Sequence, residues 1–120
     1  MDKTFMFVGA LMGGIGVAIG AFGAHGLRGR LSPEMLAVFE TGVRYHLYHA
    51  LALLATAAIM PRVEGRAVLV AGWSFTTGIV LFSGSLYALA LSGVTTLGAI
   101  TPLGGVAFLV GWISLAVAAF

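Results

Sequence analysis

The stretch TFMFVGALMGGIGVAIGAFGA, residues 4–24, runs for 21 residues without a charged side chain. A helix rises about 1.5 Å per residue, so a run of this length crosses the hydrocarbon core of a bilayer, which is about 30 Å thick. The apolar core of a secretory signal peptide is shorter, about 7 to 15 residues. The stretch therefore predicts a retained membrane span.

The composition of the whole chain extends this interpretation. Of the 120 residues, 60% are hydrophobic and only 8% are charged, whereas an ordinary globular chain carries about 25% charged residues. The length leaves room for four short-looped spans and no separate soluble domain. The net charge of +2 comes from few, scattered residues, so we expect no nucleic-acid partner. Without cysteine the chain has neither a disulfide nor a thiolate ligand.

The chain predicts an all-α membrane protein in which four transmembrane helices form a compact bundle. Ser32 and Pro33 are typical of a helix start. As a helix, residues 33–45 have one apolar face and one polar face. This amphipathic segment is expected at the interface, leading into the second span either as one long helix or as two with a bend near Gly42. Thr101 and Pro102 predict the start of the last helix. The expected single membrane domain, 1–120, has spans at about 4–25, 41–60, 67–91 and 102–120.

The basic residues give the expected orientation. With four crossings, the termini and the turn at 61–66 share one side with Lys3, Arg62 and Arg66, and the other side has Arg28, Arg30 and Arg44. The count is even. Glu40 can pair with Arg44 one helical turn later, and discounting Arg44 favours both termini in the cytoplasm. We therefore expect a multi-pass protein of the cytoplasmic membrane.

Small residues recur at helical spacing on three of the expected spans. In a membrane, such residues mark faces where helix backbones approach closely. A chain with 18 glycines also produces such stripes by chance, and the packing interpretation is favoured most on the first helix. The glycines expected at helix contacts are Gly9, Gly13, Gly16, Gly20, Gly23, Gly78, Gly104 and Gly111.

Ionisable residues within a membrane are costly and are candidates for function. Two histidines three residues apart lie about 60° apart around a helix, which suits a shared metal ion or a proton path. The alternative, which we favour, is that these groups satisfy one another and the backbone, with tyrosines at the interface. We expect no catalytic, cofactor or metal site. The candidate polar cluster comprises His25, Glu40, Arg44, Tyr45, His46, Tyr48 and His49.

His25 also has two interpretations of its own. It stands among Gly23, Gly26 and Gly29 at the end of the first apolar run. Its ring can bind the free carbonyls of a helix end, where a cation is also favoured. Alternatively, the glycines unwind the helix within the membrane to line a cavity, as in transporters with broken helices.

Four motifs carry a resemblance to a known family. GAFGAHGL at 20–27, FETGVRYHLYHALALL at 39–54, FSGSLYALAL at 82–91 and LGAITPLGGVAFLVGW at 97–112 resemble domain-of-unknown-function family 423, small membrane proteins related to transmembrane protein 256. The resemblance implies a multi-pass bacterial membrane protein without an established activity or catalytic residues. The family pattern often carries glutamine at the position of His46, which argues against a metal site formed by His46 and His49.

Three classes of function follow. The favoured one is a non-enzymatic structural or interaction bundle that supports membrane integrity. Its expected partners are membrane lipids, and a homo-oligomer is left open. The alternative is a small oligomeric transporter or channel whose pathway is lined by the His, Glu and Arg side chains, with hydroxyls from Ser83, Ser85, Thr76 and Thr77. An enzyme or metal carrier that uses the histidines is the least favoured.

Overall fold

The computed structural model describes residues 2–120, which contain helices and no strand. One rod of the structure is built from three consecutive helical segments, and the other three rods are single helices. The elements in chain order are α1 (Asp2–Gly26), α2 (Pro33–Ile59), the 3₁₀ turn η1 (Met60–Arg62), α3 (Ala67–Gly78), the π-helical η2 (Ile79–Ser83), α4 (Gly84–Ser92), the 3₁₀ turn η3 (Thr95–Ala99) and α5 (Thr101–Val117).

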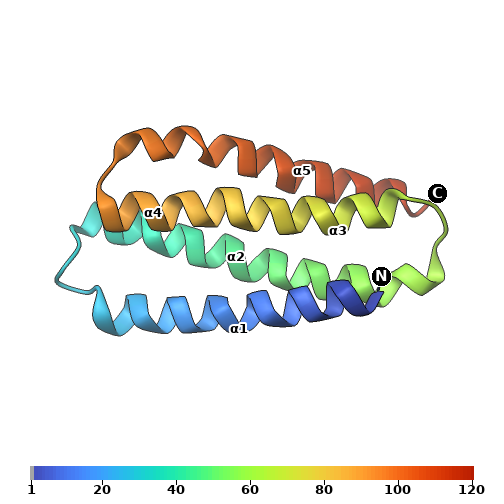
Figure 1. Cartoon of the computed structure of the whole chain (residues 1–120), viewed down its shortest axis with the longest axis horizontal. Coiled ribbons are helices and arrows are strands. Elements are labelled where there is room, and N and C mark those ends of the chain that lie inside the picture. The colour runs from blue at the N-terminus through green and yellow to red at the C-terminus, as the bar shows by residue number, and fades with distance from the viewer. Residues whose placement is uncertain (1) are drawn as a thin grey trace.

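The four rods run antiparallel, side by side (Figure 1). α2 and the rod formed by α3, η2 and α4 lie between the outer helices α1 and α5. Both chain termini and the α2–α3 turn lie at one end, and the other two connections lie at the opposite end (Figure 1). The Cα atoms extend over 49 × 26 × 16 Å, so the bundle is flattened and its length exceeds the hydrocarbon thickness of a bilayer.

α2 is one continuous helix, so the expected alternative of two helices with a bend near Gly42 is wrong. The predicted start is confirmed, because the Ser32 hydroxyl accepts a hydrogen bond from the Met35 N–H at 3.1 Å and Pro33 follows at the first helical position. The amphipathic segment forms the first turns of this helix. Gly42 permits a close contact instead, since a Cβ there would lie 2.9 Å from Tyr87 Cε1.

The third rod contains a feature that the sequence did not predict. At Ile79–Ser83 the helix widens by a π turn, and α4 continues on the same axis. The predicted cap at Thr101 is also wrong. Ile100 occupies the cap position of α5 without a side-chain hydrogen bond, and the Thr101 hydroxyl lies 2.6 Å from Ser85 Oγ. The hydroxyl therefore joins α5 to α4 rather than capping its own helix.

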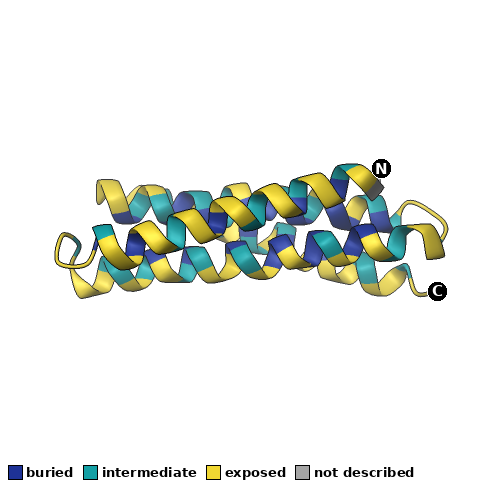
Figure 2. Cartoon of the chain, turned by 90° about the horizontal axis from the view of Figure 1, so that it is seen from below, coloured by how far each residue is buried: buried dark blue, intermediate teal, exposed yellow. Residues whose placement is uncertain are grey.

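Large side chains fill the space between the rods. Phe5, Leu53, Phe75 and Phe108 come from all four rods and form one apolar core near the end that carries the termini. Leu27, Phe39 and Ala90 form a smaller core near the opposite end. Figure 2 shows the buried residues on the inward faces and the exposed residues outside. Many exposed residues are large and apolar, as expected of a surface that faces lipid.

The glycine stripe of α1 faces α2. A Cβ on Gly9 would lie 3.0 Å from Leu53 Cβ, whereas one on Gly13 would be 4.0 Å from its nearest neighbour, Ala50 Cβ. Gly16, Gly20 and Gly23 approach Leu47, Val43 and Phe39 in turn. On the other rods, Gly78 receives the ring of Phe108, Gly111 receives the ring of Phe75, and Gly104 meets the backbone of Phe82.

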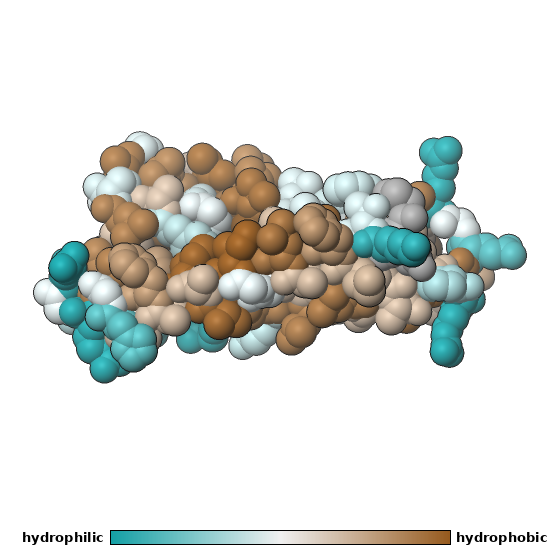
Figure 3. All heavy atoms as spheres, turned by 60° about the horizontal axis from the view of Figure 1, so that its bottom comes forward, coloured by the Kyte–Doolittle hydropathy of each residue, from teal (hydrophilic) through white to brown (hydrophobic). Residues whose placement is uncertain are grey.

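Three helical stretches of the described chain are long and apolar enough to cross a membrane. They are Lys3–Gly26, Ala67–Ser92 and Thr95–Val117. α2 has the length but is not among them, because its middle carries Arg44, His46 and His49. Hydrophilic side chains gather at the two ends of the bundle, and apolar residues cover most of the surface between them (Figure 3).

Candidate functional site

His46 lies inside the bundle, where it joins three rods. Its Nε2 is 2.8 Å from the Met12 carbonyl oxygen on α1, and its Nδ1 is 2.8 Å from the Tyr87 hydroxyl on α4. The missing side chain of Gly16 makes this approach possible, since a Cβ there would lie 3.2 Å from His46 Cδ2. His46 is only 3% exposed, so both ring nitrogens depend on these partners.

The partners of His46 assign its hydrogen. A carbonyl oxygen only accepts, so Nε2 carries the hydrogen and donates to Met12. Nδ1 of the neutral ring then accepts the Tyr87 O–H. The neutral ring thus donates one hydrogen bond and accepts another, both with partners in the same chain.

His49 takes the opposite tautomer and points to another rod. Its Nδ1–H donates to the Tyr45 carbonyl at 2.7 Å, and its Nε2 accepts the indole N–H of Trp112 at 3.0 Å. The imidazole also lies flat against the ring of Phe108, with the ring centroids 3.6 Å apart and the planes 7° apart. His49 therefore ties α2 to α5, whereas His46 ties α2 to α1 and α4.

The two tyrosines of the predicted cluster lie at the surface beside His49. The rings of Tyr45 and Tyr48 meet edge to face at 5.8 Å, and Tyr45 packs on Phe82 at 4.8 Å. Together with Phe108 they border an open groove of about 430 Å³ between α2 and α5. The tyrosine rings thus form part of an aromatic surface rather than part of the His46 network.

Glu40 and Arg44 lie on the opposite side of α2, in a groove beside α1. Arg28 lines the same groove, which has a volume of about 280 Å³. Arg44 Nη2 donates to the Thr41 hydroxyl at 3.2 Å. Arg44 therefore bonds to Thr41, one turn earlier in the same helix, in place of Glu40, the partner that the sequence predicts.

His25 is exposed in the last turn of α1. The helix continues through Gly26, and Gly29, with φ +85°, turns the chain after the helix has ended. The alternative that the glycines unwind a segment inside the membrane is therefore wrong. His25 stands at the hydrophilic end and not beside His46 or His49.

The structure thus divides the predicted polar cluster among four places. His46 lies in the interior, His49 lies in contact with α5 beside the surface tyrosines, Glu40 and Arg44 lie in the α1 groove, and His25 lies at one end. Within residues 2–120, no three His, Asp or Glu side chains come close enough together to hold a metal ion. His46 and His49 are separated because their rings bind different neighbouring helices.

Sequence reasoning did not identify Tyr87, Trp112 and the Met12 carbonyl as partners of the histidines. An imidazole in a largely apolar helix signals that partners exist, but each of these partners is 34 or more residues away along the chain. Three of the four hydroxyls proposed for a transport pathway bind helix carbonyls instead. Ser83 donates to Gly42, Ser85 to Phe82 and Thr76 to Gly72, at 2.7, 2.9 and 2.9 Å.

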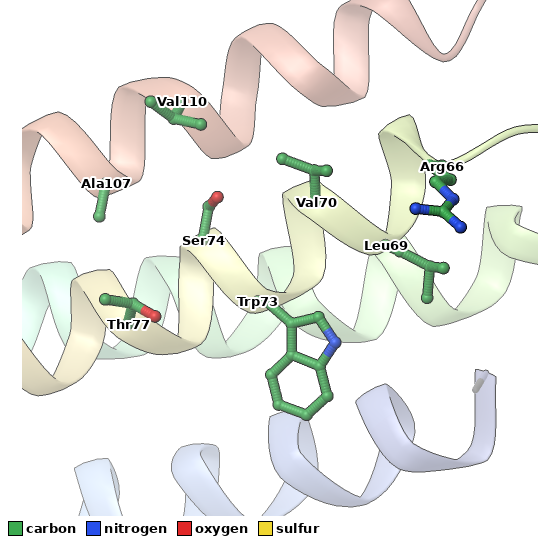
Figure 4. Close-up of a pocket in the computed structure, with 8 residues that line it drawn as sticks. All are labelled: Arg66, Leu69, Val70, Trp73, Ser74, Thr77, Ala107 and Val110. Atoms are coloured by element: carbon green, nitrogen blue, oxygen red, sulfur yellow. The ribbon is translucent and has the colours of Figure 1, made fainter.

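A groove of about 620 Å³ between α3 and α5 is lined by Thr77 but by no residue of the predicted polar cluster. Figure 4 shows Ser74 and Val110 lying between the two helices, while Trp73 turns toward α1. Trp73 contacts Phe5 of α1 edge to face at 5.3 Å. This groove is an open, mostly apolar feature of the surface.

Comparison with known proteins gives this chain a family. The family model described as "Protein of unknown function (DUF423)" matches residues 19–105. The chain belongs to the DUF423 family. UPF0382 membrane protein YwdK of Bacillus subtilis is 51% identical over 118 residues, which cover 98% of this chain and 96% of YwdK.

UPF0382 membrane proteins of Staphylococcus aureus and Staphylococcus epidermidis are each 48% identical to this DUF423 chain. The matches cover 98% and 97% of this chain and 96% and 94% of the relatives. No solved structure matches it. The family resemblance expected from the motifs is therefore confirmed, and the apolar helices identify a multi-pass membrane protein.

Proposed function

We propose that this DUF423 protein is a non-enzymatic bundle of four membrane spans that supports the integrity of the cytoplasmic membrane. One observation carries the proposal. Every buried side-chain nitrogen or oxygen within the described residues has a hydrogen-bond partner in the same chain. A transport pathway needs polar groups left free for a passing ion or solute. In the interior, His46, His49 and Ser83 instead use their polar atoms to hold the rods together.

The contacts of α2 support its assignment as the fourth span. Its 27 residues rise about 40 Å, enough to cross the hydrocarbon core. α2 lies between α1 and the third rod, so the bundle shields His46 and His49 from lipid. Polar groups in a span are tolerated when they face the interior and are paired. Low hydropathy is therefore compatible with a crossing at this central position.

The charges at the two ends support an orientation with both termini in the cytoplasm. The end with the termini carries Lys3, Arg62 and Arg66, and the opposite loop carries Arg28 and Arg30. Arg44 lies within a helix and is not counted with the loops. The excess of basic residues then lies at the end with the termini, as the positive-inside rule requires of a cytoplasmic side.

The buried hydroxyls support a non-enzymatic role. A nucleophilic hydroxyl needs a base within hydrogen-bond reach. Ser83 and Ser85 instead donate to the carbonyls of Gly42 and Phe82. Both imidazoles are committed to carbonyl, phenol and indole groups. These side chains act as links between helices rather than as a reactive set.

Single cysteines in this cysteine-free chain test the proposal. Ser83→Cys is nearly isosteric and probes the core, whereas Arg30→Cys and Glu64→Cys probe the two ends. In intact membranes, a water-soluble thiol reagent should label positions 30 and 64 from opposite sides and leave position 83 unlabelled until denaturation. Labelling of position 83 at the rate of position 64 would overturn the dry core in favour of transport. Labelling of positions 30 and 64 from the same side would overturn the four spans.

The role in membrane integrity needs a cellular measurement. Cells that lack their own copy should admit more of a membrane-impermeant dye, and the wild-type chain should restore the barrier. An unchanged barrier with and without the chain would contradict this part of the proposal.

A further inference from the structure

A polar groove on the lipid-facing side of α1 and α2 contains more charge than the chain itself neutralises. Its lining includes Gly20 and Gly23, which pack against Val43 and Phe39, together with Arg28, Glu40 and Arg44. All three charged residues are exposed. Two arginines and one glutamate therefore line a groove of about 280 Å³.

Arg44 is the residue that most needs an external partner. Gly20 packs on Val43 and Gly23 packs on Phe39, so the backbone of Arg44 lies about one helical turn inside the apolar end of α1. Its hydrogen bond within the chain goes to the neutral Thr41 hydroxyl. A cation at this depth is costly unless it is paired, and its long side chain can reach toward the headgroup region.

The charges in the groove match one class of ligand. A phosphate diester accepts charge-assisted hydrogen bonds from guanidinium groups, as Arg28 and Arg44 can provide. A primary ammonium group donates to a carboxylate, as Glu40 can provide, whereas a trimethylammonium group has no N–H to donate. Two cations and one carboxylate are therefore complementary to the phosphate and ammonium of phosphatidylethanolamine.

The surface beside the polar groove suits an acyl chain. A second groove of about 340 Å³ lies between the same two helices and is lined by Gly13, Gly14, Val17, Leu47 and Leu51 among others. Its lining is apolar, and Val17 and Leu51 are exposed to more than half of their surface, at 63% and 64%. Lipid tails gain no hydrophobic energy by moving from lipid to protein, so the headgroup provides the selectivity.

We propose that the α1–α2 groove binds phosphatidylethanolamine, with its phosphate at Arg28 and Arg44, its ammonium at Glu40 and one acyl chain along Gly13 and Gly14. This site rests on the proposed function, because it requires the groove to face the bilayer at headgroup depth. The groove is expected to distinguish phosphatidylethanolamine from other lipids by the chemistry of its headgroup.

Native mass spectrometry of the full chain in detergent micelles tests the site. Dioleoyl phosphatidylethanolamine, phosphatidylcholine and phosphatidylglycerol are titrated separately, and the dissociation constant of each lipid adduct is measured. The wild type should bind phosphatidylethanolamine severalfold more tightly than phosphatidylcholine. Arg44→Gln should weaken phosphatidylethanolamine binding about tenfold, because it removes a charge-assisted bond to phosphate. Arg62→Gln, at the opposite end, is the matched control and should leave binding unchanged.

Glu40→Gln separates the two parts of the headgroup. It should reduce the affinity for phosphatidylethanolamine to that for phosphatidylcholine and leave phosphatidylglycerol binding unchanged or tighter. Arg44→Lys, which keeps the charge but loses the planar fork, should lie between wild type and Arg44→Gln. Equal binding of the three lipids by the wild type, or unchanged binding in both Arg44 variants, would overturn the site.

The same samples separate a failure of the site from a failure of the proposed function. A Ser83→Cys background reports the state of the core in each titration. A protected thiol with no lipid selectivity would overturn the lipid site alone. A thiol open to water in the native protein would overturn the dry bundle, whatever the lipid data show.

Discussion

Gly104 of α5 lies directly against the backbone of Phe82, at the π turn of the third rod. A Cβ on Gly104 would lie 2.6 Å from Phe82 Cα and 2.7 Å from Phe82 Cβ. Real Cβ atoms do not approach other atoms so closely, and a helix backbone cannot move aside as a side chain can. This contact fixes how closely α5 approaches the third rod.

Gly104→Ala should therefore destabilise the bundle. We expect the free energy of unfolding to fall by about 1–3 kcal/mol, because the added methyl group pushes two backbones apart. Thermal unfolding in detergent micelles measures the effect. Gly105→Ala is the matched control, since its Cβ would lie 4.0 Å from Phe82 Cδ2, and it should be neutral or stabilising by up to about 1 kcal/mol. Equal melting temperatures for both variants would contradict the contact.

Alanine substitutions along the glycine stripe of α1 should differ in their effect on the free energy of unfolding. Gly9→Ala should lower the free energy of unfolding by about 1–2 kcal/mol, because its Cβ would meet Leu53 Cβ at 3.0 Å and the Ala50 carbonyl oxygen at 3.1 Å. Gly13→Ala should be neutral or slightly stabilising, because its nearest contact would be 4.0 Å away and alanine favours the helix. Unfolding titrations of both variants in mixed micelles compare the two. The prediction fails if Gly13→Ala is the more destabilising variant.

His46 should be replaceable by glutamine but not by leucine. A glutamine amide offers one N–H for the Met12 carbonyl and one oxygen for the Tyr87 hydroxyl, the same donor and acceptor that the imidazole provides. His46→Leu removes both bonds and leaves the Tyr87 hydroxyl without this partner, and we expect a loss of about 1–3 kcal/mol in the free energy of unfolding. Tyr87→Phe removes only one of the two bonds, so its free energy of unfolding should lie between those of the glutamine and leucine variants. A leucine variant as stable as the glutamine variant would show that the bonds do not matter.

His49 and Trp112 should be energetically coupled across α2 and α5. Trp112→Phe keeps a ring against Phe75 but removes the indole N–H that donates to His49 Nε2. A double-mutant cycle with His49→Leu should give a coupling free energy of about 0.5–1.5 kcal/mol, within the range for polar contacts between membrane helices. The emission of Trp112 in a Trp73→Phe background reports on the same bond and should shift in His49→Leu. Additive losses and an unshifted emission would contradict the bond.

Local chemistry decided most of what could be predicted about the fold. The charge-free run at residues 4–24 determined a span, because a bilayer requires about 20 apolar residues in a helix. Ser32 and Pro33 determined the start of α2, because a hydroxyl cap and a fixed φ act within one turn. The π turn and the missing cap at Thr101 were not predicted, because both depend on how α5 packs against the third rod.

The polar residues show the limit of the sequence most clearly. Their presence in α2 was evident, since ionisable side chains stand out in an apolar chain. Their separation was not evident from the sequence. A spacing of three residues places His46 and His49 near one another on the helix but does not decide which neighbour each ring faces. The sequence by itself thus determined a helical membrane protein with polar residues in its second helix. Only the tertiary structure decided that His46 binds α1 and α4 while His49 binds α5, because hydrogen-bond partners far apart in the chain meet only when the rods pack.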